Sequence, residues 1–299
     1  MGTAKARRIR EGSIRGLFAI LAFASLLFLI GITVTLFLEG GPVFKDVNFF
    51  DFIFGKSWYP THEDAEFGIL PLILGSLWVT AGAVLVCVPL GVGSALFINE
   101  LAGRKLRAFL KPILELLAGV PSIVYGFFGM VVLAPFLQRL LNLPVGLTAF
   151  TGSLILGVMA TPTVASISED ALSFVPKSFR EASYALGANR WQTLTKVVIP
   201  ASASGISTAI ILGMSRAIGE TMTVLMVCGG AAVIPHTLFQ PVRPMTATIA
   251  AEMGEAVFGS IHYHALFAIG LILFFITLMF NIIAELISRR FRLKLGLGR

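Results

Sequence analysis

Long apolar stretches that contain almost no charge are the feature that most constrains how this sequence folds. Five of them reach the length of about 20 residues that a helix needs to cross the hydrocarbon core of a bilayer. They run approximately over 16–38, 69–98, 113–137, 149–168 and 265–287. Of the 299 residues, 56% are apolar and 13% are charged, whereas about a quarter of the residues of a soluble domain are charged. The sequence predicts an all-α integral membrane protein.

A sixth block, at about 199–229, is apolar except for Arg216 and Glu220 in its middle. Counting it as a span places 18 of the 23 Lys and Arg residues on one side of the membrane. They lie in the segments 1–15, 99–112, 169–198 and 288–299. Cytoplasmic loops collect Lys and Arg. This distribution predicts six transmembrane helices with both termini in the cytoplasm, and it explains the net charge of +7 without nucleic acid as a partner.

The first long segment on the predicted outside, 39–68, is acidic and rich in aromatic residues. Trp58 and Tyr59 are residues that favour a membrane interface, and we expect them there. The segment is either a contact surface for an outside partner or a solvated loop.

The second outside segment, 230–264, contains the apolar stretch 245–258, which is typical of a short interfacial helix. His262 and His264 form an H-x-H pair without a third ligand nearby, so the sequence predicts no metal site here.

Gly and Pro interrupt several predicted spans, in "CVPLGVG", "AGVPSIVYGFFG" and "MATPTVAS". A broken helix is tolerated at membrane depth only where protein or a water-filled cavity satisfies the freed backbone groups. The interruptions therefore favour helices that line a pathway over simple anchors.

The cytoplasmic segment 169–198 carries helix signals in a polar context. Ser178 followed by Glu181 is a capping-box pattern, and Gly187 is placed to end a short helix in the left-handed conformation. Asn189 is placed to cap a second short helix. These signals predict a helical knob that projects into the cytoplasm.

The knob resembles a known motif. Glu181-Ala182-Ser183, three residues, Gly187, nine residues and Val197-Val198-Ile199-Pro200 is similar to the EAA motif, E-A-A-x3-G-x9-I-x-L-P, of ABC-importer permeases. Ser183 replaces the second Ala, Val197 the Ile and Ile199 the Leu. The resemblance implies a type I ABC importer permease fold, in which the knob, with Ala182 and Ser183 on its surface, docks into a cytoplasmic ATPase. The residues assigned to coupling are Glu181, Ala182, Ser183, Gly187 and Pro200.

Further stretches are similar to the permease subunits of phosphate importers, in their C type rather than their A type: "GVPSIVYGFFGMVVLAPFLQ", "SRAIGETMTVLMVCGG" and "MTATIAAEMGEA". The resemblance covers about 69–288, which it implies is the permease domain. Residues 1–68 would then hold an N-terminal tail, the first span and an outside loop, and 289–299 a basic cytoplasmic tail. The implied partners are a second, A-type permease subunit, a cytoplasmic ATPase dimer and an extracytoplasmic phosphate-binding protein, in a bacterial or archaeal cytoplasmic membrane.

No nucleotide-binding loop is present, because "GSLILGV" and "GGPVF" lack the Gly-Lys-Ser/Thr ending. We expect this chain to bind no cofactor and to be no enzyme, with ATP and Mg²⁺ used by the partner ATPase. A membrane-embedded enzyme would also need a nucleophile–base constellation, and all four His residues lie outside the spans.

Placing the charges of Arg216 and Glu220 in a membrane costs free energy, so these residues should face a cavity or a partner. Being four apart on one helix, they are expected to meet. An Arg with a second, transient partner explains their presence, since guanidinium binds phosphate oxygens through paired hydrogen bonds. Thr221 and Thr223 offer further hydroxyl donors along this pathway, although hydroxyls more often bond back to their own helix. A purely structural pair, a permease for phosphonate, sulfate or molybdate, and a passive anion channel remain alternatives.

Overall fold

The computed structural model describes the backbone of residues 2–294, and the side chains of residues 14–286, 288 and 289. Within this part of the chain, six helical segments are long and apolar enough to cross a membrane, as predicted. They are Ile14–Lys45, Leu70–Leu101, Ser122–Leu140, Ala149–Ser173, Arg190–Ile218 and Ile261–Leu286. Part of the predicted tail 289–299 continues the last helix to Lys294, and the rest lies outside the described residues.

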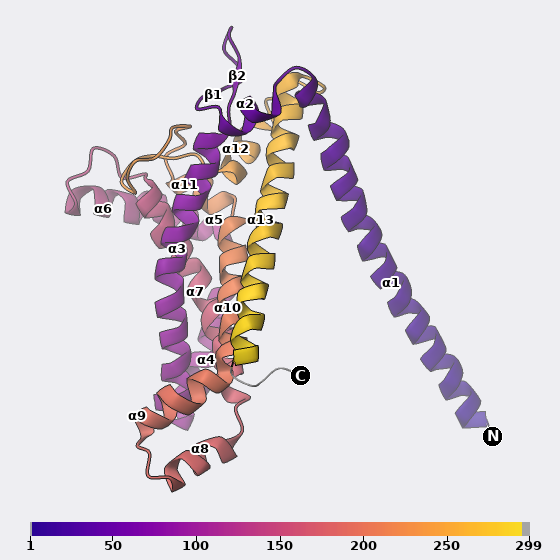
Figure 1. The fold of residues 1–299 in the computed structure, drawn as a ribbon, viewed down its shortest axis with the longest axis vertical. Coiled ribbons are helices and arrows are strands. Elements are labelled where there is room, and N and C mark those ends of the chain that lie inside the picture. The colour runs from indigo at the N-terminus through magenta and orange to yellow at the C-terminus, as the bar shows by residue number, and fades with distance from the viewer. Residues whose placement is uncertain (1, 295–299) are drawn as a thin grey trace.

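The long helices form a bundle, from which shorter elements project at both ends (Figure 1). The first half of the chain supplies α1 (Gly2–Gly40), α3 (Leu70–Leu96) with the π-helical turn η2 (Phe97–Leu101), α4 (Arg104–Ala118), α5 (Ser122–Phe128), the π-helical turn η3 (Gly129–Leu133) and α6 (Ala134–Leu140). The second half supplies α7 (Ala149–Ser173), α8 (Lys177–Ala185), α9 (Arg190–Thr193), the π-helical turn η4 (Leu194–Val198), α10 (Ile199–Ile218), α11 (Met222–Val227), α12 (Met245–Glu252) and α13 (Ile261–Lys294).

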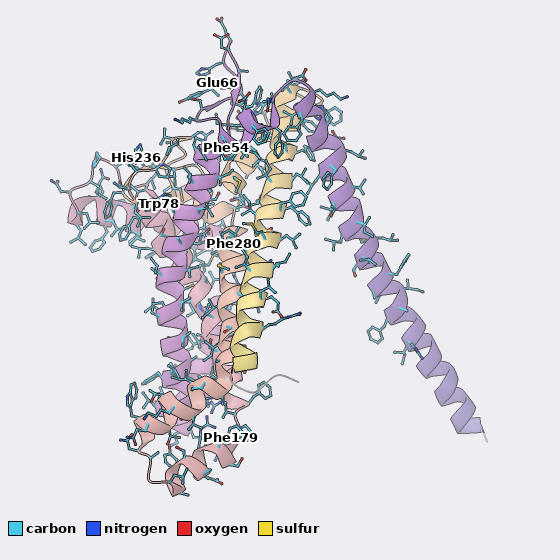
Figure 2. All side chains as sticks on the ribbon, viewed as in Figure 1. Phe54, Glu66, Trp78, Phe179, His236 and Phe280 are labelled. Atoms are coloured by element: carbon cyan, nitrogen blue, oxygen red, sulfur yellow. The ribbon has the colours of Figure 1, made fainter. Side chains whose placement is uncertain are left out.

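The centre of the bundle is α7, which packs against α3 and α10. Close approach of α3 and α7 requires small residues: a Cβ built on Gly157 would lie 2.6 Å from the Cβ of Val86. Small residues at such contacts are the usual way in which membrane helices come together. By contrast, α1 diverges from the bundle and meets α13 only near its C-terminal end (Figure 1). Figure 2 shows its side chains projecting into open space along most of its length.

Both described ends of the chain lie at the same end of the bundle as α8 and α9 (Figure 1). This is the end that the basic residues assign to the cytoplasm. The opposite end carries a 3-10 turn η1 (Gly41–Lys45), α2 (Phe49–Phe54) and a two-stranded antiparallel hairpin of β1 (Trp58–Tyr59) and β2 (Glu66–Phe67). The predicted outside segment 39–68 is therefore folded onto the bundle rather than left as an open loop.

Trp58 is not at the membrane interface, contrary to the prediction. Its side chain is 2% exposed, and its indole N–H donates to the two oxygens of Glu252, at 3.0 and 3.2 Å. A tryptophan can be buried at little cost when its N–H has such an acceptor. Tyr59, the next residue on the strand, points the other way and is exposed.

The helix predicted over 245–258 forms only over α12, and it is not interfacial. Its first turn is buried in protein, with the backbone N–H of Met245 donating to the Ser76 hydroxyl at 2.9 Å. Glu252 at its other end joins three elements, because Arg243 Nη1 lies 2.6 Å and His262 Nε2 lies 2.9 Å from its oxygens. His264 instead contacts the Glu39 carbonyl, so the two His side chains do not converge.

We predict that Glu252→Ala lowers the stability of the outer end. The change leaves the N–H groups of Trp58, Arg243 and His262 without their shared acceptor, at a cost of about 2 kcal/mol. Thermal unfolding of the purified protein in detergent measures the effect. Glu255→Ala, at an exposed position of the same loop, serves as the control, and equal melting temperatures for the two variants would contradict the prediction.

Candidate functional site

Arg216 lies near the end of α10, half-buried, and its guanidinium bridges two other helices. Nη1 donates to the hydroxyl of Thr163 on α7 at 3.2 Å, and Nη2 donates to the carbonyl of Ala118, the last residue of α4, at 3.4 Å. Thr163 is on the order of 20 Å along α7 from Ala149 and on the order of 15 Å from Ser173, at 1.5 Å per residue. Because α7 crosses the whole membrane, Arg216 contacts it close to mid-depth.

Glu220 does not pair with Arg216, and, contrary to the prediction, the two residues do not lie on one helix. α10 ends at Ile218 with Gly219 as its C-cap, and α11 begins only at Met222. Glu220 falls in the break, where its Oε1 accepts from the backbone N–H of Thr223 at 3.2 Å. The carboxylate thus satisfies an unpaired donor at the start of α11. Sequence periodicity missed the break, because Gly219 is the only helix-weakening residue in it.

The two threonines of the predicted pathway are bound differently. Thr223 is fully buried, and its hydroxyl donates to the carbonyl of Ser122 at the start of α5, at 3.0 Å. Thr221 is half-buried and reaches only the carbonyl of Gly219, at 3.5 Å. The Thr223 hydroxyl therefore joins α11 to α5 across the bundle, and it also lies 3.3 Å from Oε1 of Glu220, three residues earlier in the chain.

Two helix interruptions and the start of α12 meet around Arg216 and Glu220. The predicted span 113–137 is broken at 119–121, between α4 and α5. The predicted span at about 199–229 is broken at 219–221, between α10 and α11. The start of α12 joins them, since the hydroxyl of Thr246 donates to the carbonyl of Glu220 at 2.7 Å. Non-helical backbone at membrane depth is tolerated only where protein or water satisfies it. Here side chains do so. Of the three stretches that Gly and Pro were expected to interrupt, only "AGVPSIVYGFFG" contains a break, whereas α3 continues through Pro89 and α7 through Pro162. That these helices line a pathway stays a prediction.

Arg216 is a cation whose two acceptors are both neutral. Among the residues that the structure describes, no carboxylate forms an ion pair with it. One acceptor is the carbonyl at the C-terminal end of α4, where the helix dipole carries partial negative charge. A guanidinium at this depth with neutral partners leaves a net positive charge, which is suited to an anion.

The cytoplasmic knob consists of α8 and α9, as predicted, joined through Gly187 at φ +82°. Asn189 and Gln192 form a reciprocal capping box at the start of α9. The box predicted at Ser178 does not form, because α8 already begins at Lys177 with Pro176 as its N-cap.

Glu181 and Ala182 are exposed on α8, whereas Ser183 is buried, contrary to the prediction. The hydroxyl of Ser183 lies 2.9 Å from that of Thr193, which locks α8 to α9. Pro200 is the second residue of α10, directly after the π-helical turn η4. The motif residues therefore divide into two that face outward and three that shape the knob.

Large apolar side chains are exposed around the knob. Phe174, Leu186 and Trp191 are 84%, 89% and 69% exposed, and Figure 2 shows Phe179 at the same end of the molecule. Exposed apolar side chains gathered in one place mark a site of interaction with a protein or a membrane.

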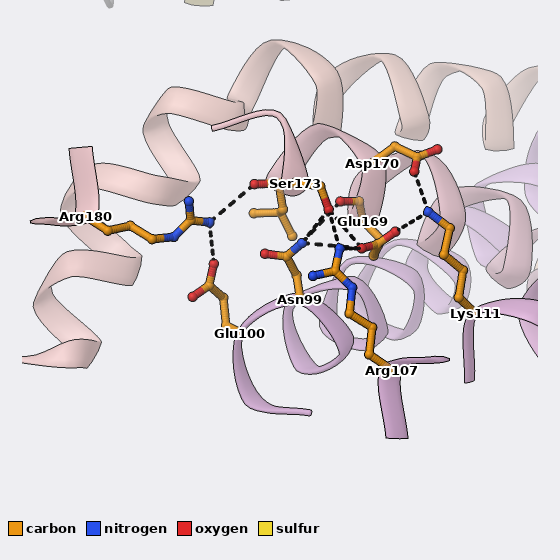
Figure 3. A network of polar contacts seen from close by, with 9 residues as sticks. Asn99, Glu100, Arg107, Lys111, Glu169, Asp170, Ser173 and Arg180 are labelled. Atoms are coloured by element: carbon orange, nitrogen blue, oxygen red, sulfur yellow. Dashed lines mark hydrogen bonds and ion pairs between the residues drawn. The ribbon is translucent and has the colours of Figure 1, made fainter. Parts of the chain in front are cut away.

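A network of charges that no sequence pattern predicted lies where the knob joins the bundle (Figure 3). Its centre is Glu169 on α7, a carboxylate only 1% exposed. It accepts from Arg107 and, at 2.8 Å, from Lys111, both on α4. Lys111 also pairs with Asp170 at 2.7 Å, and this contact, followed by that to Glu169, raises the pKa of Lys111 above its usual value. The sequence signal for this network was the acidic pair Glu169-Asp170 at the end of an apolar span, on the same side of the membrane as the basic segment 99–112.

Comparison with known proteins decides the class. Residues 87–293 match the sequence profile described as "Binding-protein-dependent transport system inner membrane component". The chain belongs to this family. It is a multi-pass membrane protein and a transmembrane permease subunit of an ABC importer, not an enzyme.

Among curated relatives, "Probable ABC transporter permease protein YqgH" of Bacillus subtilis is 38% identical over 281 residues, covering 93% of this chain and 91% of the relative. "Phosphate transport system permease protein PstC" of Mesorhizobium japonicum is 37% identical over 294 residues, covering 92% and 89%. "Phosphate transport system permease protein PstC 1" of Mycobacterium tuberculosis is 34% identical over 258 residues, covering 79% and 76%. The similarity to these relatives extends over most of this chain.

Solved structures support the same fold. A chain of a bacterial alginate ABC transporter aligns with a TM-score of 0.65 at 17% identity, covering 92% of this chain and 94% of that one. A chain of the MetNI methionine ABC transporter aligns with a TM-score of 0.56 at 19% identity, covering 75% and 94%. The predicted type I ABC importer permease fold is confirmed.

We predict that close packing between α5 and α11 supports the site. A Cβ on Gly126 would meet Met226 Sδ at 2.9 Å and the Cα of Thr223 at 3.2 Å. Gly126→Val should therefore push α11 away and cost about 1–3 kcal/mol, read as a lower melting temperature in detergent. Gly93→Val adds the same atoms where nothing lies within 4 Å. The prediction fails if the Gly93 variant is destabilised as much as the Gly126 variant.

Proposed function

We propose that this chain is one permease subunit of an ATP-driven importer of inorganic phosphate. It forms half of the transmembrane pathway, and a second, similar A-type subunit forms the other half. The observation that carries the proposal is Arg216, a cation near mid-membrane that is held by two neutral acceptors. The curated relatives named for phosphate transport support the choice of anion.

The geometry suggests how Arg216 handles the anion. Its present contacts, at 3.2 and 3.4 Å, are long and go to uncharged oxygens. Hydrogen bonds from guanidinium to phosphate oxygens are shorter and about twice as strong. Phosphate reaching this depth replaces Thr163 and the Ala118 carbonyl as the partner of Arg216. When the anion leaves, the guanidinium binds the same neutral groups again, so the site does not retain the anion.

Glu220, Thr221 and Thr223 act at the same place in different ways. Glu220 holds the start of α11 and keeps the helix break open, rather than neutralising Arg216. The half-buried Thr221 hydroxyl has only a weak contact and is free to donate to a passing anion. Thr223 keeps α11 against α5 through Ser122.

Energy reaches the pathway from a cytoplasmic ATPase dimer, which uses ATP and Mg²⁺. Glu181, Ala182 and the exposed apolar residues of the knob form the docking surface for this ATPase. Ser183, Gly187 and Pro200 give the knob its shape. An extracytoplasmic phosphate-binding protein delivers the substrate at the hairpin end, and the whole complex lies in a bacterial or archaeal cytoplasmic membrane.

We predict that Arg216→Gln abolishes phosphate uptake while the complex still assembles. Gln keeps some donors but loses the charge that makes the anion's entry favourable. Uptake of labelled phosphate into proteoliposomes that contain the complete complex measures the loss, and copurification of the subunits measures assembly. Arg139→Gln, at an exposed position on α6, is the control and should keep normal uptake.

The same assay separates this proposal from its alternatives. Sulfate, molybdate or phosphonate that competes more strongly than unlabelled phosphate would identify another oxyanion as the substrate. Uptake that continues without ATP would identify a passive channel. Normal phosphate uptake by the Arg216 variant would remove the basis of the proposal.

We predict that Ala182→Asp and Gly187→Val uncouple the permease from the ATPase. The first places a charge on the exposed docking face, and the second places a β-branched residue at φ +82°, a conformation that such residues avoid. ATP hydrolysis should lose its stimulation by the loaded binding protein, by roughly tenfold or more. Gly103→Val, in open space on the same side of the membrane, should leave stimulation intact. Normal stimulation in both test variants would rule out the coupling role.

A further inference from the structure

The guanidinium of Arg216 donates hydrogen bonds to two other helices at once. Its acceptors are the last carbonyl of α4 and a hydroxyl of α7. A displacement of α4 relative to α7 therefore changes the distance between the two acceptors. The guanidinium fork is rigid, so it cannot follow such a change and keep both contacts.

The same two helices are tied together on the cytoplasmic side by the charge network. Arg107 and Lys111 of α4 both donate to Glu169 of α7. Lys111 is on the order of 10 Å along α4 from Ala118, and Glu169 is on the order of 9 Å along α7 from Thr163. The network and the grip on Arg216 are thus two contacts between one pair of helices, less than two full turns apart.

The knob is attached to this network. Arg180 of α8 donates to Glu100 Oε1 at 2.7 Å and to the carbonyl of Val175 at 2.9 Å. Asn99, next to Glu100, donates to Ser173 Oγ at 2.7 Å and reaches Glu169 Oε1 at 3.4 Å. Figure 3 shows these side chains in a row, from Arg180 through Glu100 and Asn99 to Glu169 and Lys111. These contacts connect the knob to the end of α7.

We propose that Glu169 is a positioning residue for Arg216, because it clamps α4 to α7 and so sets the spacing of the two groups that hold the guanidinium. Movement of the knob against the bundle loosens or tightens this clamp through Arg180 and Asn99. The proposal rests on the role of Arg216 in phosphate transport. It adds the route by which the docking surface reaches the anion site.

The chemistry of the clamp fits a positioning role better than a stabilising one. A buried carboxylate with two cations seldom makes a protein more stable than apolar residues of the same volume would. It does define one arrangement of the helices, since a slip of α4 against α7 separates Glu169 from both cations and leaves it only the hydroxyl of Ser173 on its own helix. Lys111 and Arg107 are both partly exposed, at 36% and 39% of their side-chain area, so they can exchange partners with water when the helices move.

A double-mutant cycle in the complete reconstituted complex tests the clamp. Glu169→Gln removes the charge at almost constant shape, and Thr163→Val removes the hydroxyl that holds Arg216. Each change alone should lower phosphate uptake at least tenfold and raise the ATP hydrolysed per phosphate imported by a similar factor. If both act on the grip of Arg216, the double variant should be within twofold of the weaker single variant. Independent effects would instead multiply to about a hundredfold.

Controls keep the outcome interpretable. Glu115→Gln makes the same chemical change at an exposed position on α4 and should leave uptake and the ATP ratio unchanged. Thr163→Ser keeps the hydroxyl and should retain uptake. If Glu169→Gln does not assemble, Lys111→Gln takes its place in the cycle, because it leaves Arg107 on Glu169.

The results separate this proposal from the proposed function. A wild-type complex that does not import phosphate overturns the proposed function. A wild-type complex that imports phosphate, with losses that multiply in the double variant, overturns only the clamp. Losses that do not multiply, in assembled complexes, support it.

Discussion

The placement of Arg216 is the constraint on which the rest of the structure depends. A charged side chain near the middle of a membrane helix costs several kcal/mol on any scale and is retained only for a function. The protein meets part of this cost with the Thr163 hydroxyl and the terminal carbonyl of α4, and it leaves the charge without a carboxylate. The site is therefore stable enough to form and keeps the net positive charge that the proposed role in anion transport requires.

Holding Arg216 in this way requires the helices to break. A continuous α4–α5 helix would have no free carbonyl at Ala118, because each carbonyl inside a helix already accepts from the fourth residue along. A continuous α10–α11 helix would leave Glu220 beside Arg216, where the two would neutralise each other. The breaks provide an acceptor for the cation and turn the carboxylate into a helix cap.

The broken ends must then be supported, and the fold supports them with close packing. Thr246 donates to the carbonyl of Glu220 in one break, Thr223 donates to the carbonyl of Ser122 at the start of α5, and Gly126 lets α5 lie directly against α11. At the cytoplasmic end, Glu169 holds α4 and α7 together beneath the site. The knob is built onto the same helix ends, so the proposed docking surface and the proposed anion site share one structural support.

The parts of this arrangement that follow from local rules were predictable from the sequence. Apolar length predicted the six spans, the basic residues predicted the side on which the chain ends lie, and the turn residues Gly187 and Asn189 predicted the two helices of the knob. Parts that depend on contacts between distant segments were not. The partners of Arg216, the burial of Trp58 and the Glu169 network each join residues that are at least 50 positions apart, and no periodicity reports such pairs.

The partial failures have physical causes as well. A spacing of four residues predicts a contact only if the helix continues, and Gly219 ends it. The apolar stretch after Pro244 was equally suited to lipid and to protein, and only the fold shows that α3 and α13 bury it. The roles of Arg216, Glu220, Thr221 and Thr223 in transport stay predictions, as do the domain limits at residues 69 and 288.

The most direct test of the account is to locate the anion itself in the assembled complex. Arsenate has the shape and charge of phosphate and scatters anomalously, so crystals of the complex grown with arsenate would show its arsenic atom without ambiguity. The account predicts arsenate oxygens within about 2.7–3.2 Å of the Arg216 guanidinium nitrogens, with the contacts to Thr163 and Ala118 released. Arsenate bound in the pathway while Arg216 still holds Thr163 and Ala118 would contradict it.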